Sequence, residues 1–154
     1  MINIVRMTTP IQSIILIDDD NDCNLLTKFA IHKAEILVEI HIFNFAEEAL
    51  EFIQINYSNN LYDHPTTILL DINMGTMSGW EFMEAFSLLS GKIKKQFQIF
   101  FLSSSVDEHD KSRALSIPLI AGYLEKPLSQ ETLIKISKVE PKDGDRYHTD
   151  PSRK

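Results

Sequence analysis

The chain has 154 residues, of which 44% are hydrophobic, so it is long enough for one domain with a substantial core and too short for two. Its formal net charge of -7 argues against broad nucleic-acid binding. The single cysteine, Cys23, excludes an internal disulfide framework, and we expect a cytoplasmic protein. No apolar stretch approaches the roughly 18 residues that a membrane span needs.

Apolar runs and amphipathic stretches alternate through the first half of the chain. The order predicts a flexible extension (1–12), a buried strand (13–17), a helix (21–34), a strand (35–45), a helix (46–57) and a turn-rich loop (58–65). Asp20 or Asn21 is the expected N-cap of the first helix. One apolar face of that helix is formed by Leu25, Leu26, Phe29 and Ala30. The inward residues of the second helix are Ala49, Leu50 and Ile53.

The same alternation continues in the second half. It predicts a strand (66–71), a helix (78 to about 90), a strand (98–103), a short charged helix (107–116), a strand within 119–124, a last helix (129–139) and a polar, disordered tail (140–154). Ser78 and Glu81 have the spacing of a capping box, which predicts where the third helix begins.

Five strands that alternate with five helices predict an α/β fold, a doubly wound five-stranded parallel sheet with helices on both faces. Right-handed crossovers place every strand C-terminus at one edge, where ligands bind in such sheets. Five polar residues fall at or just past strand ends and should converge there: Asp18, Asp19, Asp71, Ser103 and Lys126.

The acidic residues among these favour a cation site. Carboxylates packed closely repel one another unless a cation lies between them, and Mg²⁺ binds oxygen ligands. By itself the run Asp18–Asp20 would be a solvated turn with an N-cap. The apolar strand before it and the acid Asp71 at another strand end favour the metal site instead.

Asp71 has the chemistry of a nucleophile, because aspartate can form an acyl phosphate. Phosphoryl transfer needs positioning and charge neutralisation, which Lys126 could supply beside a metal ion. Ser103 is either a hydroxyl donor to a phosphoryl oxygen or a turn-forming serine. Cys23 is interpreted as a buried helix residue. The sequence contains no Gly-rich phosphate loop, so nucleotide hydrolysis is disfavoured.

Four motifs in this order resemble the receiver domain of two-component response regulators over residues 13–139. They are Ile-Leu-Ile-Asp-Asp-Asp (15–20), Leu-Leu-Asp-Ile-Asn-Met (69–74) with Gly79 and Trp80, Phe-Leu-Ser-Ser (101–104) and Gly-Tyr-Leu-Glu-Lys-Pro (122–127). The resemblance implies a (βα)5 flavodoxin-like receiver fold. Gly75 departs from the family, which usually has proline there, and this predicts a looser loop.

The resemblance also implies a role for each matching residue. Asp71 would be the phosphoacceptor, with Mg²⁺ or Mn²⁺ held by Asp18, Asp19, Asp71 and the backbone carbonyl of Asn73. Ser103 and Tyr123 would be the switch residues, Lys126 the charge partner of the phosphoryl group, and Pro127 a cis-proline.

The function implied is a stand-alone, single-domain regulator rather than an enzyme with an external substrate. A sensor histidine kinase or histidine phosphotransfer protein would phosphorylate Asp71. The face made by the fourth predicted helix, the fifth strand and the last helix would then change and signal to a downstream protein, with a homodimer possible. Two alternatives are a phosphorylation-independent adaptor and a small Mg²⁺-dependent phosphatase. The phosphatase is disfavoured because Asn73 stands where a second aspartate would be needed.

Overall fold

The computed structural model describes residues 13–59 and 66–138. The extension predicted at residues 1–12 and the tail predicted at residues 140–154 lie outside the described residues. Within the described ranges, no helix is long and apolar enough to cross a membrane.

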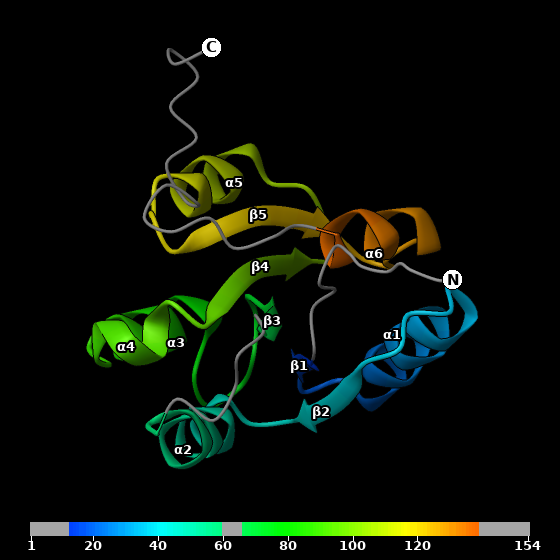
Figure 1. The fold of residues 1–154 in the computed structure, drawn as a ribbon. Helices are drawn as coiled ribbons and strands as arrows, with labels where there is room; N and C mark the ends of the chain where they lie inside the picture. Colours follow the sequence, from blue (N-terminus) through cyan, green and yellow to red (C-terminus); the bar gives the residue numbers. More distant parts are fainter. Residues whose placement is uncertain (1–12, 60–65, 139–154) are drawn as a thin grey trace, which may run out of the picture.

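The described residues form one five-stranded sheet in which every strand is parallel, in the order β2-β1-β3-β4-β5 (Figure 1). Its strands are β1 (Ser13–Ile17), β2 (Glu39–Phe43), β3 (Thr66–Asp71), β4 (Phe97–Ser103) and β5 (Ile120–Glu125). The predicted doubly wound parallel sheet is therefore confirmed. The strand order reverses between β1 and β3, and Ile17 is paired with Leu70. Asp18 and Asp71 consequently follow neighbouring strand positions at the point where such sheets bind ligands.

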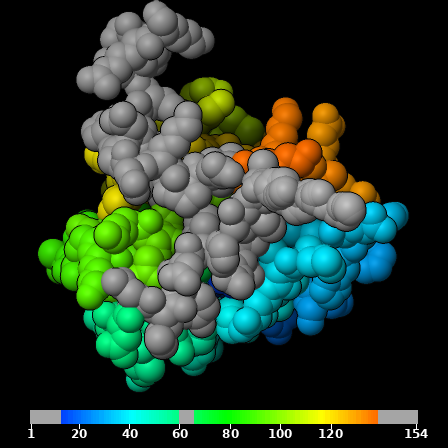
Figure 2. All heavy atoms as spheres, in the orientation of Figure 1, coloured from blue at the N-terminus to red at the C-terminus, as the bar shows by residue number. Residues whose placement is uncertain are grey.

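Helices cover both faces of the sheet (Figure 1). One face carries α1 (Asn21–Lys33) and α6 (Gln130–Ser137); the other carries α2 (Ala46–Tyr57), α3 (Gly79–Ser87), α4 (Gly91–Lys94) and α5 (Glu108–Leu115). The space-filling view shows α6 above α1 on one side of the molecule, with α2 and α3 on the other (Figure 2). Alternate strand residues supply two separate cores. Ile15 and Ile17 belong to the α2–α5 side, whereas Ile14 and Leu16 belong to the α1–α6 side.

The second strand is shorter than predicted, because the residues before it end the first helix. Glu35 has a φ of 59°, and its N–H donates to the carbonyl of His32. The N–H of Ile36 donates to the carbonyl of Ile31. These two hydrogen bonds with a left-handed residue form a helix-terminating motif. The chain then turns, with Leu37 92% exposed, before β2 begins at Glu39.

Of the apolar face predicted for the first helix, Ala30 packs against the core, but the three larger residues do not face the sheet. Leu25, Leu26 and Phe29 are 65%, 60% and 64% exposed, and the helix instead buries Asn24, Thr27 and Ile31. The side-chain amide of Asn24 donates to the carbonyl of Asp18 at 2.9 Å, which fixes this polar side against the end of β1. Helical periodicity located an apolar face but not the direction in which it points.

The third helix ends slightly earlier than predicted, and a short helix that was not predicted follows it. Ser78 and Glu81 form the predicted capping box, so α3 begins where expected. It ends at Ser87, and the hydroxyl of Ser90 then accepts a hydrogen bond from the N–H of Ile93 to cap α4. The described residues therefore contain six helices rather than five. A side-chain cap of this kind allows a new helix to begin only a few residues after the previous one ends.

Candidate functional site

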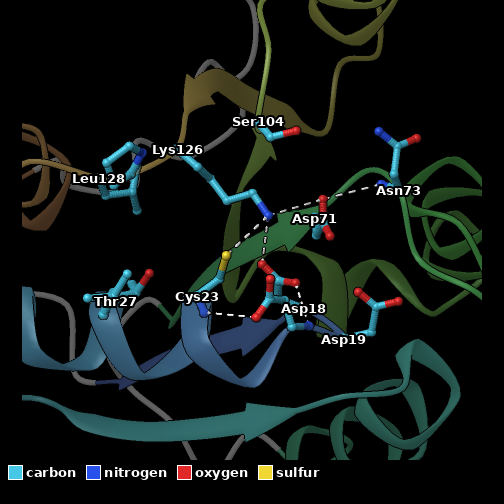
Figure 3. A pocket seen from close by; sticks show the side chains of 12 residues that line it. Asp18, Asp19, Cys23, Thr27, Asp71, Asn73, Ser104, Lys126 and Leu128 are labelled. Atoms are coloured by element: carbon cyan, nitrogen blue, oxygen red, sulfur yellow. Dashed lines mark hydrogen bonds and ion pairs between the residues drawn. The ribbon is translucent and has the colours of Figure 1, made fainter.

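Three residues that are far apart in sequence meet at the carboxyl edge of the sheet (Figure 3). The ammonium of Lys126 lies 2.9 Å from Asp18 Oδ2 and 3.6 Å from Asp71 Oδ1. Both carboxylates are buried, with residue exposures of 3% for Asp18 and 6% for Asp71. The peptide bond between Lys126 and Pro127 is cis, as predicted. The structure thus brings together two buried acids and one amine.

Asp18 is held by hydrogen bonds from three directions. Its N–H donates to the carbonyl of Phe43 at 3.1 Å, and its carbonyl accepts from the amide of Asn24. Its Oδ1 accepts from the N–H of Asp20 at 2.9 Å, which leaves Oδ2 directed at Lys126. The turn after β1 therefore presents this carboxylate in one orientation, while Asp20 caps α1 as predicted.

Asp71 ends β3 and is supported by the loop that follows it. Its Oδ1 accepts a hydrogen bond from the N–H of Asn73 at 3.3 Å. The loop closes where the N–H of Gly79 donates to the carbonyl of Ile72 at 2.8 Å. A Cβ on Gly79 would lie 2.9 Å from the Asp71 carbonyl oxygen, so only glycine allows α3 to begin this close to the site.

The crowding of charges shifts the acidity of the site. Burial and, after it, the neighbouring Asp18 carboxylate raise the pKa of Asp71 to about 6, against the opposing effect of the Lys126 charge. Burial by itself would lower the pKa of Lys126, but the hydrogen bond that its ammonium donates to Asp18 and the charge of Asp71 outweigh this effect, so the net direction is upward. The lysine therefore keeps its charge, and Asp71 is ionised at neutral pH at a cost in stability.

The donor set at this edge suits a hard divalent cation. Asp18, Asp19 and Asp71 each offer a carboxylate oxygen, and these three atoms lie within 4.8 Å of one another. Mg²⁺ and Mn²⁺ prefer such oxygen ligands, so the residues present fit the predicted metal. The backbone carbonyl of Asn73 stays a predicted ligand. The contact that this residue makes with the site is through its N–H, which donates to Asp71 Oδ1.

The predicted switch residues lie beside the site but do not contact Asp71 in the hydrogen bonds of the described residues. The hydroxyl of Ser103 donates to the carbonyl of Ser105 at 2.5 Å. The ring of Tyr123 packs against the α2–α5 core. Its hydroxyl is buried and has no hydrogen-bond partner within residues 13–59 and 66–138. Ser103 thus ends β4 and Tyr123 lies within β5, and neither hydroxyl is hydrogen-bonded to the acids in the described residues.

A cavity of about 480 Å³ opens over the acids, and its wall includes residues that the sequence did not assign to a site. These additional residues are Cys23, Leu26, Thr27, Ser104 and Leu128. Cys23 was expected to be buried, but its Sγ faces the cavity 4.0 Å from the lysine ammonium, and burial raises the pKa of the thiol. The sequence feature that could have indicated this location is the position of Cys23 in the first turn of α1, just after the acid Asp18 at the end of β1. Ser104, rather than Ser103, lines the wall.

Comparison with known proteins places this site in a family. The family model described as "response regulator receiver domain" matches residues 14–138. The chain belongs to the response regulator receiver family. This match confirms the predicted resemblance. Receiver domains act in phosphorylation-based signalling by two-component systems. No curated protein matches the chain.

Solved structures resemble this receiver over most of its length. A two-component response regulator from Cytophaga hutchinsonii is 29% identical, with a TM-score of 0.76, and the match covers 83% of this chain and 95% of that one. A response regulator receiver protein from Dyadobacter fermentans is 28% identical, with a TM-score of 0.72 and coverage of 81% and 94%. The Vibrio cholerae chemotaxis protein CheY4, at 24% identity, a TM-score of 0.64 and coverage of 82% and 95%, shares the fold.

Proposed function

We propose that this receiver accepts a phosphoryl group on Asp71 from a histidine kinase or a histidine phosphotransfer protein, with Mg²⁺ or Mn²⁺ required. The observation that carries the proposal is the placement of one buried, ionisable carboxylate 3.6 Å from a lysine ammonium and beside two more acids. In this proposal the protein is a phosphoacceptor and not an enzyme that turns over an external substrate.

The chemistry follows from the side chains of the site. One carboxylate oxygen of Asp71 attacks phosphorus, an O–P bond forms, and the P–N bond of the phosphohistidine breaks with its electron pair going to the imidazole. Lys126 balances charge on the phosphoryl oxygens. A divalent cation held by Asp18, Asp19 and Asp71 would supply further charge neutralisation. Because the pKa of Asp71 is about 6, its carboxylate is ionised and nucleophilic at neutral pH.

The output of phosphorylation is proposed to be a change in the face formed by α5, β5 and α6. A phosphoryl group on Asp71 would attract the hydroxyl of Ser103 away from the Ser105 carbonyl. The Tyr123 ring, which packs on the core beneath α5, would adjust to that movement. The altered face would then bind a downstream protein or a second copy of the chain, in the cytoplasm.

The phosphodonor is proposed to dock on the exposed apolar face of α1. Leu25, Leu26 and Phe29 are each at least 60% exposed, and Leu26 also lines the cavity over the acids. An apolar patch of this kind beside the reacting carboxylate suits a helical protein surface that carries the phosphohistidine.

Replacing Phe29 by serine should therefore slow transfer from a phosphorylated histidine phosphotransfer domain by about tenfold, the loss of one good apolar contact. Phosphorylation by acetyl phosphate, which needs no docking surface, should be unchanged. Quench-flow or gel assays with labelled donor measure the first rate. The exposed Leu37, far from the cavity, offers the matched control Leu37→Ser. Equal transfer rates for the Phe29 and Leu37 variants would argue against this docking face.

The proposed function is tested by incubating the protein with acetyl phosphate and Mg²⁺, then measuring its mass. We expect one added phosphoryl group that is lost in base, is absent when EDTA replaces Mg²⁺, and does not form on the Asp71→Asn variant. The absence of any adduct on the wild-type protein would favour the phosphorylation-independent adaptor. Continuous rapid release of phosphate would favour the phosphatase.

A further inference from the structure

The loop after β3 contacts the metal-site acids through a backbone group that a proline would lack. The N–H of Gly75 donates to Asp19 Oδ2 at 3.2 Å, joining two loops that are 56 positions apart in sequence. Proline has no backbone N–H, so this hydrogen bond depends on the departure from the proline usual at this position. The glycine, expected to loosen the loop, instead connects it to one of the three acids.

Asp19 differs from the other two acids in having little else to orient it. Its side chain is exposed, whereas Asp18 and Asp71 are buried and lie beside Lys126. Among the described residues, the carboxylate of Asp19 accepts one hydrogen bond, from the N–H of Gly75. The same loop is also tied to α2, where the hydroxyl of Thr76 donates to Glu47 at 3.3 Å. The loop is therefore anchored to α2 as well as to Asp19.

We propose that the N–H of Gly75 is a positioning group that holds the Asp19 carboxylate toward Asp18 and Asp71 and thereby strengthens Mg²⁺ binding. This inference rests on the proposed function, which includes the cation. One carboxylate oxygen is occupied by the N–H, and the other is left for the metal. An exposed side chain that is oriented beforehand loses less rotamer freedom when the ion binds, and groups that orient metal ligands strengthen metal affinity for this reason.

The position allows a matched pair of variants. The φ of Gly75 lies outside the left-handed region, and a Cβ there would meet only Asp19 Oδ2, at 4.0 Å. Gly75→Ala therefore keeps the N–H without strain, whereas Gly75→Pro removes it. Titration calorimetry with MgCl2 should give an affinity for Gly75→Ala within about twofold of the wild type. The affinity of Gly75→Pro should be about three- to tenfold weaker, which corresponds to one lost hydrogen bond.

A double-mutant cycle with Asp19→Asn separates positioning from general distortion of the loop. In that background Gly75→Pro should no longer change Mg²⁺ affinity, because the carboxylate it positions is gone. Wild-type affinity in Gly75→Pro, equal weakening by alanine, or a proline effect that persists with Asp19→Asn would each overturn the inference. If Gly75→Pro does not fold, an ester in place of the peptide between residues 74 and 75 removes the same N–H. A wild-type protein that binds no Mg²⁺ would instead contradict the proposed function.

Discussion

Replacing Lys126 by methionine is expected to slow formation of the Asp71 acyl phosphate by about two to three orders of magnitude, the usual effect of removing one charge-stabilising group. The ammonium lies 3.6 Å from Asp71 Oδ1, close enough to balance charge on an incoming phosphoryl group. Methionine keeps the length of the side chain but supplies neither charge nor hydrogen bonds. The rate is measured with acetyl phosphate at saturating Mg²⁺, by mass spectrometry against time.

Mg²⁺ affinity shows whether the lysine acts on the phosphoryl group or on the metal. Removing a cation from beside Asp18 and Asp71 reduces repulsion of Mg²⁺, so the Lys126→Met variant should bind Mg²⁺ at least as tightly as the wild type. The exposed Lys135 of α6 offers the control Lys135→Met, which should react at the wild-type rate. A Lys126→Met protein that is phosphorylated as fast as this control would refute the assigned role.

Replacing Asp71 by asparagine is expected to stabilise the metal-free protein at pH 8, by about 2 kcal/mol. The pKa of Asp71 is raised from its usual 3.8 to about 6, mainly because the carboxylate is buried. The folded protein therefore holds the Asp71 proton more tightly than the unfolded chain does. The resulting destabilisation is absent below about pH 4, grows as pH rises through the interval to 6, and is complete above it. Asparagine resembles the neutral carboxyl group and avoids this cost.

Urea unfolding in EDTA at pH 4 and pH 8 measures the difference, with the single tryptophan, Trp80, as the fluorescence probe. The stabilisation by Asp71→Asn should be large at pH 8 and nearly vanish at pH 4. Glu84→Gln, at an exposed position on α3, should change stability little at either pH. Added Mg²⁺ should stabilise the wild type more than the variant, because a ligand that binds the folded state stabilises it. A stabilisation independent of pH would point to a packing effect instead of the buried charge.

The sheet and the strand-end residues were predictable because both depend on local patterns. Apolar runs located all five strands, and the residue that follows each run is readable directly, as with Asp18 and Asp71. Features that depend on the path of the backbone were less accessible. The left-handed conformation of Glu35 shortened the second strand, and the cap at Ser90 begins a short helix, α4, that was not predicted. Glutamate seldom adopts a left-handed conformation, and a serine near the end of a helix can either cap a new helix or lie in a loop.

The direction of α1 illustrates a different limit. Its sequence contains a clear apolar face, yet the hydrogen bond from Asn24 to the Asp18 carbonyl turns a polar face toward the sheet. Which face of a helix is buried depends on the groups that the neighbouring strand presents to it, here the backbone carbonyl of Asp18. The same orientation brings Cys23 into the cavity wall, where the sequence alone predicted a buried helix residue.

By itself, the order of residues determined the chemical groups of the site, since amino-acid type and position after a strand are local properties. It also determined the parallel α/β topology, because alternating strands and helices admit few other arrangements. Only the tertiary structure decided how those groups meet: the lysine between two buried acids, the Ser103 hydroxyl on the Ser105 carbonyl, and the Gly75 amide on Asp19. These contacts depend on the path of the backbone, which sets the distance between the groups, and the identity of a side chain does not specify that path.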